Sequence, residues 1–235
     1  MSKKFTDQIP NTITLCNLLS GCVAVYMAFH SSETFGVLTG MQFAWISVAM
    51  AALFDFCDGA SARLLRAYSE IGRELDSLAD LVSFGVAPGM MMLNLIKDVS
   101  PNPWIGFSAL LIPLLGAYRL AKFNVDTTQS TTFRGLPIPA NAIFWIGLCA
   151  WIINFGYIGD FASVILILAV STLMISNIRM FSLKFKNFNL QENFRRYILI
   201  IATVLFLVFF GVSGLMWTIV LYVLISVFGR KDFQA

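Results

Sequence analysis

Charged residues are scarce in this chain of 235 residues, where they make up only 12% of the sequence, against about 25% in soluble domains. Hydrophobic residues make up 58%, and the mean hydropathy is +0.78. A water-soluble fold of this composition would have too few polar side chains to cover its surface. The composition therefore excludes a soluble domain with one anchor and predicts an integral membrane protein.

Cysteine and histidine are also few. The four cysteines lie in apolar stretches and form no CxxC pair: Cys16, Cys22, Cys57 and Cys149. They are predicted to be buried side chains rather than metal ligands or disulfide partners. The single histidine, His30, ends an apolar run and is expected at the membrane interface. No signal peptide is evident before the first apolar run.

Eight stretches are apolar enough to cross a bilayer, which takes about 20 residues. They cover about residues 12–30, 38–65, 72–96, 104–123, 138–157, 160–180, 195–211 and 213–229. Helices are expected throughout, because backbone groups in hydrocarbon must be hydrogen-bonded internally. No repeat or linker divides the chain. We therefore predict an all-α bundle of eight transmembrane helices in a single membrane domain, residues 1–235.

The basic residues predict the orientation of this bundle. With the N-terminus in the cytoplasm, 15 of the 16 Lys and Arg residues fall on inner segments, and only Lys97 falls outside. Both termini are thus predicted to be cytoplasmic. The net charge of +3 says little about nucleic acid, because basic residues near a membrane are expected to attract the anionic inner leaflet. Nothing resembles a base-reading module, so no nucleic acid partner is expected.

Four carboxylates interrupt the second and third predicted spans, and an ionisable residue inside a span indicates a functional site. Asp55 and Asp58 are spaced i, i+3, and Asp76 and Asp80 are spaced i, i+4, so each pair shares a helix face. The two helices are consecutive and antiparallel. Asp55 and Asp76 are 11 and 10 residues from Arg66, or about 15 Å along each helix. All four acids are therefore expected in one layer below the cytoplasmic surface.

Crowded carboxylates repel one another unless they are protonated or bind cations. Oxygen ligands favour hard divalent ions, Mg²⁺ or Mn²⁺. Two ions would balance four negative charges, so we predict two metals per site. The small residues Gly59, Ala62 and Gly72 lie beside the acids, where they would let a ligand or a helix approach closely.

These seven residues and Arg63 form a spaced pattern over 26 positions: Asp55, Asp58, Gly59, Ala62, Arg63, Gly72, Asp76 and Asp80. This pattern resembles the signature of the CDP-alcohol phosphatidyltransferases at every specified position. That family transfers the phosphate-linked group of a CDP-activated donor to an alcohol and releases CMP, using two divalent metals. Within it, stretches of residues 9–140 look most like the membrane-bound phosphatidylserine synthases. The resemblance implies a catalytic core over about 9–180 with six helices, and an extra C-terminal hairpin over about 195–229.

The resemblance also implies roles for individual residues. The four aspartates would hold the metals, and Asp80 would in addition act as the general base. The residues expected to contact the CDP group are Gly59, Arg63, Ser69, Gly72, Asn11 and Thr14. A homodimer is implied by the resemblance alone.

The expected acceptor is L-serine, and the donor is CDP-diacylglycerol. The serine carboxylate calls for a cation, ideally a planar guanidinium. Three basic residues are expected at the same depth in the membrane as the acids: Arg119, Lys122 and Arg134. We expect Arg134, which lies between Phe133 and a Gly-Leu-Pro turn, to bind this carboxylate.

Two other interpretations stay open at the level of sequence. The same chemistry could use another acceptor, glycerol 3-phosphate or inositol phosphate, although a phosphorylated acceptor would need more cations than the few near the acids. An ion-coupled transporter also buries acids, but no inverted repeat is visible. Metal-dependent CMP release would separate a transferase from a transporter. The absence of a targeting segment is consistent with a bacterial inner membrane.

Overall fold

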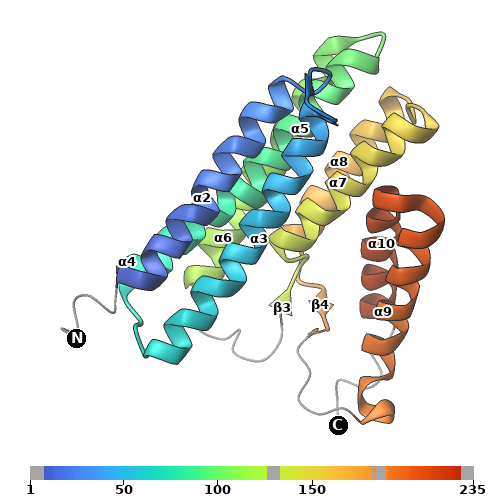
Figure 1. The fold of residues 1–235 in the computed structure, drawn as a ribbon. Helices are drawn as coiled ribbons and strands as arrows, with labels where there is room; N and C mark the ends of the chain where they lie inside the picture. The colour runs from blue at the N-terminus through green and yellow to red at the C-terminus, as the bar shows by residue number, and fades with distance from the viewer. Residues whose placement is uncertain (1–7, 126–132, 182, 184–188, 229–235) are drawn as a thin grey trace.

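The computed structural model describes residues 8–125, 133–181, 183 and 189–228 of the chain, and these residues form a bundle of helices (Figure 1). The α-helices are α2 (Gln8–Phe29), α3 (Gly40–Leu65), α4 (Glu70–Asp80), α5 (Ala87–Val99), α6 (Leu111–Val125), α7 (Ile138–Phe155), α8 (Asp160–Ile175), α9 (Leu190–Phe210) and α10 (Gly214–Phe228). Shorter turns of helix join some of them: the π-helix η1 (Leu81–Val86) and the 3₁₀-helices η2 (Pro103–Leu110) and η3 (Gly211–Ser213).

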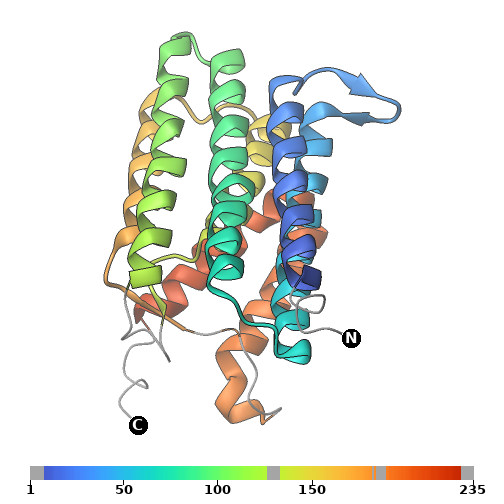
Figure 2. The same ribbon diagram turned by 90° about the vertical axis from the view of Figure 1, so that its left-hand side faces the viewer.

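Two small antiparallel ladders lie at opposite ends of the bundle (Figures 1 and 2). Strand β1 (Thr34–Phe35) pairs with β2 (Leu38–Thr39), and β3 (Phe133–Arg134) pairs with β4 (Arg179–Met180). The second ladder ties the segment before α7 to the segment after α8. It lies at the same end of the bundle as the turn between α3 and α4, which is the end near the acidic residues.

Six stretches within the described residues are long and apolar enough to cross a membrane: Gln8–Phe29, Gly40–Leu65, Glu70–Val99, Pro103–Val125, Ile138–Phe155 and Asn193–Phe228. The chain is therefore an integral membrane protein with an all-helical fold. The count of eight spans stays a prediction for two reasons. Helix α8 has only 16 residues, and α9, η3 and α10 form one apolar stretch of 36 residues.

The C-terminal stretch is nevertheless folded back on itself. Figure 1 shows α9 and α10 side by side, joined at one end by η3. Helix α10 packs directly on α7, where a Cβ at Gly147 would collide with the backbone of Met216. Trp151 of α7 contacts the rings of Phe210 and Trp217, with centroids 6.1 and 5.9 Å away. The tight helical hairpin expected from the sequence is thus present.

Local capping sets the ends of the two helices that carry the acids. Thr39 and Gln42 form a reciprocal capping box at the start of α3, which satisfies two backbone donors. Helix α3 stops at Arg66, whose φ of 51° is left-handed. Ser69 then caps α4 by accepting a hydrogen bond from the backbone of Gly72 at 2.9 Å. The short turn returns α4 alongside α2 and places its acids beside those of α3.

The first and last described residues of the chain lie at the same end of the bundle. Figures 1 and 2 place the start of α2 and the end of α10 near the α3–α4 turn and the β3–β4 ladder. The predictions for the termini fall on residues 1–7 and 229–235, which lie outside the described part of the chain, as do Lys184 and Lys186 of the predicted inner loop.

Candidate functional site

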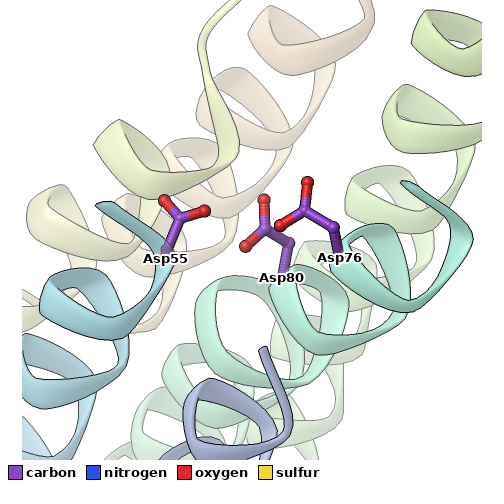
Figure 3. Close-up of side chains that lie close together, drawn as sticks. All are labelled: Asp55, Asp76 and Asp80. Atoms are coloured by element: carbon purple, nitrogen blue, oxygen red, sulfur yellow. The ribbon is translucent and has the colours of Figure 1, made fainter. Parts of the chain in front are cut away.

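Three carboxylates from two helices converge toward the end of the bundle that carries the α3–α4 turn and the β3–β4 ladder, which we call the inner end, the opposite end being the outer end. Asp55 projects from α3, and Asp76 and Asp80 project from successive turns of α4, as Figure 3 shows. One carboxylate oxygen from each lies within 4.8 Å of the others. The i, i+4 spacing on α4 and the antiparallel α3–α4 turn produce this arrangement, so the predicted convergence is observed for these three residues.

The fourth acid, Asp58, has a different environment. It is 5% exposed, and its Oδ2 accepts a hydrogen bond of 2.6 Å from the hydroxyl of Thr14 on α2. It does not belong to the group of three that meet within 4.8 Å. Asp58 and Asp76 do line one common cavity, so Asp58 lies next to the cluster and turned toward α2.

One carboxylate oxygen of Asp76 lacks a hydrogen-bond donor in the described structure. Its Oδ1 is buried and has no hydrogen-bond partner within the described residues. A buried carboxylate oxygen without a donor is costly, and two further carboxylates face it. Hard oxygen ligands of this kind suit a divalent cation such as Mg²⁺ or Mn²⁺. The donor set and the orphaned oxygen therefore both fit a metal ion.

A first cavity, of about 210 Å³, opens beside the acids between α2, α3 and α4. Its lining includes five of the six residues predicted to contact CDP: Asn11, Thr14, Gly59, Ser69 and Gly72. A Cβ at Gly72 would lie 2.9 Å from both Asn11 Oδ1 and Ser69 Oγ, so glycine keeps this cavity open.

The sixth predicted residue, Arg63, lies just outside this lining. Its Nη1 is 3.6 Å from the place that a Cβ of Gly59 would occupy. Ser69 has a structural role that the sequence interpretation missed, because its hydroxyl already caps α4.

A second cavity, of about 610 Å³, lies on the other side of the acids. It shares Arg73 and Asp76 with the first cavity, and Asp55, Asp80 and Arg119 also line it. The two cavities therefore meet at the carboxylate cluster. This geometry allows one ligand to approach the acids from each side.

The three candidate acceptor ligands are neighbours, but only one reaches the large cavity. Arg119, Lys122 and Arg134 together line a small void of about 10 Å³. Of these three, Arg119 alone also lines the cavity that contains Asp80. The Arg119 Nε is buried without a hydrogen-bond partner in the described structure, whereas Lys122 donates to Asn177 Oδ1 at 3.4 Å. Arg119 is therefore the candidate that shares a cavity with Asp80, and the acceptor role of Arg134 stays a prediction.

Two buried polar residues near the acids were missed. The amide of Asn17 on α2 donates to Asp80 Oδ1 at 3.4 Å, and Tyr222 on α10 lines the larger cavity. Asn17 had a usable signal, because Thr14, Asn17 and Gly21 follow a helical spacing of three and four residues and all are buried. Tyr222 had none, since it is one aromatic residue in a uniformly apolar helix.

Comparison with known sequences decides the family. The family model described as CDP-alcohol phosphatidyltransferase matches residues 7–228, which is nearly the whole chain. The chain belongs to this family. All four aspartates and both cavities fall within the matched region.

Several relatives carry the same name, CDP-diacylglycerol–serine O-phosphatidyltransferase. The chain is 37% identical over 187 residues to that of Bacillus subtilis, covering 77% of this chain and 92% of the relative. It is 34% identical over 155 residues to that of Mycobacterium leprae, covering 63% of this chain but only 48% of the relative. For Methanocaldococcus jannaschii the identity is 34% over 171 residues, covering 73% and 72%.

Proposed function

We propose that this chain transfers the phosphatidyl group of CDP-diacylglycerol to L-serine, giving phosphatidylserine and CMP. The observation that carries the proposal is the cluster of Asp55, Asp76 and Asp80, whose oxygens lie within 4.8 Å of one another where two cavities meet. Family membership supplies the reaction class, and the names of the relatives support serine as the acceptor.

The nucleotide is assigned to the smaller cavity. Gly59 and Gly72 leave room for it, and Asn11, Thr14 and Ser69 offer polar atoms along the wall. Arg63 beside Gly59 is placed to approach a phosphate or the base from the open side. The acyl chains of the donor would stay in lipid while its pyrophosphate lies at the acids.

Asp55, Asp58, Asp76 and Asp80 are the residues that would hold divalent metal, Mg²⁺ or Mn²⁺, with two ions per site. Bound cations would offset the charge of the pyrophosphate and favour departure of CMP. Hydrogen bonding of Asp58 to Thr14 would fix the direction of its carboxylate and so connect the metal ligands to the wall of the nucleotide cavity.

The acceptor is assigned to the larger cavity. Arg119 Nε would donate to the serine carboxylate, and Asp80, in the same cavity, would take the proton from the serine hydroxyl. The oxygen of that hydroxyl forms a bond to the phosphorus of the phosphatidyl group, and the bond from this phosphorus to the CMP oxygen breaks. Phosphoryl transfer depends mainly on such positioning and on charge neutralisation.

The same proposal includes the orientation in the membrane. Nine basic residues of the described chain belong to the segments near the acids: Arg63, Arg66, Arg73, Arg119, Lys122, Arg134, Arg179, Arg195 and Arg196. Lys97 belongs to the opposite end. By the positive-inside rule the acids face the cytoplasm, so soluble serine and CMP exchange with it. We place the protein in a bacterial inner membrane with both termini cytoplasmic, as one membrane domain that forms a homodimer.

The test is an assay of the purified protein in detergent with CDP-diacylglycerol and a panel of acceptors: L-serine, glycerol 3-phosphate and inositol phosphate. CMP release is expected with serine, with added Mg²⁺ or Mn²⁺, and not after chelation by EDTA. CMP release with a phosphorylated acceptor but not with serine would overturn the acceptor, and no CMP release with any of them would overturn the transferase.

A further inference from the structure

A short chain of buried polar groups lies behind the carboxylate cluster. Ser83 in η1 donates its hydroxyl to Asn17 Oδ1 at 2.7 Å, with a second acceptor, the Asn17 carbonyl oxygen, at 3.1 Å. Asn17 Nδ2 in turn donates to Asp80 Oδ1 at 3.4 Å. Asn17 and Ser83 are both 0% exposed. The groups therefore form a continuous path from Ser83 through Asn17 to Asp80.

The Asp80 carboxylate, which only accepts hydrogen bonds, determines which way the Asn17 amide points, and the Ser83 hydroxyl donates to the amide oxygen on the other side. An asparagine amide has a donor side and an acceptor side that can be exchanged by a flip. The flipped amide would direct its oxygen at the carboxylate of Asp80, and two facing oxygens repel. With Ser83 donating to Oδ1, the Nδ2 side faces Asp80. The Oδ1 atom of Asp80 is thereby hydrogen-bonded from the side of α2, and this bond restricts the rotation of the carboxylate.

The backbone is specialised at this point. The α-helical turns of α4 end at Asp80, and the next six residues form the π-helix η1, a rare conformation that occurs often at functional sites. Ser83 faces α2 at Gly21, where a Cβ would collide with the Ser83 hydroxyl. Glycine at position 21 and the π-helix together bring Ser83 within hydrogen-bonding distance of Asn17.

Asn17 lies outside both candidate substrate sites, because it belongs to the lining of neither the 210 Å³ nor the 610 Å³ cavity. Any contribution of Asn17 to the reaction must therefore act through Asp80. Partners that orient a metal ligand commonly affect metal affinity or activity by about 10- to 100-fold.

We propose that Asn17 and Ser83 are positioning residues that orient the Asp80 carboxylate for metal binding and for proton transfer. This inference rests on the proposed function for the role of Asp80. The inference is based on the hydrogen-bonded path, on the fixed orientation of the Asn17 amide and on the close contact between α2 and η1. None of these observations depends on the identity of the acceptor.

The experiment compares wild type, Asn17→Leu and Ser83→Ala as purified full-length proteins. Asn17→Leu should lower kcat for CMP release roughly 10- to 100-fold, as expected for loss of a hydrogen bond to a charged group. The KM values for serine and CDP-diacylglycerol should change by less than about threefold, because Asn17 lines neither cavity. Calorimetric titration with Mn²⁺ alone should show roughly 10-fold weaker binding. Ser83→Ala should show smaller changes in the same directions.

Asn94→Leu is the matched control, since Asn94 is also buried but donates within α5, to the carbonyl oxygen of Met90 at 3.0 Å. It should lose thermal stability while keeping Mn²⁺ binding near that of wild type. Equal loss of Mn²⁺ binding in Asn94→Leu and Asn17→Leu would overturn the proposal, as would unchanged kcat and Mn²⁺ binding in Asn17→Leu. If Asn17→Leu does not fold, unchanged Mn²⁺ binding in Ser83→Ala overturns it.

The Mn²⁺ titration separates this inference from the proposed function. Wild type that binds Mn²⁺ but releases no CMP with serine would contradict the serine transferase. Weaker Mn²⁺ binding in Asn17→Leu would still support the positioning role in that case.

Discussion

Two partly buried acidic centres at opposite ends of the bundle differ in how their oxygens are satisfied. At the outer end, Asp160 Oδ1 accepts hydrogen bonds from Ser100 at 2.6 Å and from Tyr157 at 2.7 Å. At the inner end, Asp55, Asp76 and Asp80 face one another, and Asp76 Oδ1 has no partner in the described structure. The first centre is complete without a ligand, whereas the second needs a cation.

This difference shows that acidity alone does not mark a functional site in a membrane protein. A carboxylate with donors close by contributes to the packing of helix ends, as Asp160 does between α8 and the end of α5. Carboxylates that face one another without hydrogen-bond donors repel one another, and a bound cation relieves this repulsion. The comparison predicts loss of chemistry from changes at the inner centre and loss of stability alone from changes at the outer centre.

The largest effect is expected for Asp80→Asn, because the amide cannot take the proton from serine. Turnover should fall by roughly 100- to 10,000-fold, the range for loss of a general base, while binding of CDP-diacylglycerol stays measurable. CMP release and equilibrium binding are the measurements. Asp160→Asn is the matched control, and turnover of Asp80→Asn close to that of wild type would remove Asp80 from the mechanism.

The second-largest effect is expected for the cation that binds the carboxylate of the serine acceptor. Arg119→Ala should raise the KM for serine at least about 10-fold, since a charge-assisted hydrogen bond contributes about 1.5–3 kcal/mol. Arg134→Ala should raise it less, because Arg134 does not line the cavity that contains Asp80. Initial rates over a range of serine concentrations measure this. A larger rise for Arg134→Ala would restore the preference derived from sequence.

A smaller effect is expected on the nucleotide side. In Gly72→Ala the new Cβ would lie 2.9 Å from Asn11 Oδ1 and Ser69 Oγ, so those groups must shift and the cavity narrows. The KM for CDP-diacylglycerol should rise about fivefold, a cost near 1 kcal/mol, with the KM for serine unchanged. Gly36→Asn at the outer end is the control, because nothing lies within 4 Å of the Gly36 position. Equal KM values in wild type and Gly72→Ala would argue against this cavity as the nucleotide site.

The smallest effect concerns the outer centre. Tyr157→Phe removes one hydrogen bond to Asp160 and should lower the free energy of unfolding by about 1 kcal/mol without changing kcat. Burial raises the pKa of Tyr157 above its usual 10. The unfolded chain therefore loses this proton first, so the stabilisation is present below about pH 10 and declines as the pH rises further. Thermal unfolding at pH 7 and pH 10.5 checks this, and a large loss of activity would contradict the comparison.

The spacing of the acids was enough to predict three of the carboxylates in one place. The i, i+4 pair on α4 and the i, i+3 pair on α3 are local properties of a helix, and the short turn after Arg66 forces the helices to be antiparallel. The position of Asp58 could not be predicted in the same way. Its direction depends on Thr14, which is 44 residues earlier in the chain.

Likewise, the sequence marked three basic residues as neighbours, because Arg119 and Lys122 lie at the inner end of one predicted span and Arg134 lies in the loop that follows it. Which of them reaches Asp80 depends on the rotation of α6 and on the β3–β4 ladder, and these result from contacts between distant segments. The π-helix after Asp80 has no simple sequence signal, since Leu81–Val86 reads as an ordinary apolar helix.

The sequence by itself determined the membrane environment, the helical fold and the family, because these follow from composition, hydropathy and the spacing of residues within single helices. The tertiary structure alone decided that two cavities meet at Asp76, that Arg119 and Asp80 line one cavity, and that Asn17 donates a hydrogen bond to Asp80. Those features depend on how α2, α4, α6 and α10 rotate against one another, and helix rotation is set by side-chain packing between segments far apart in the chain.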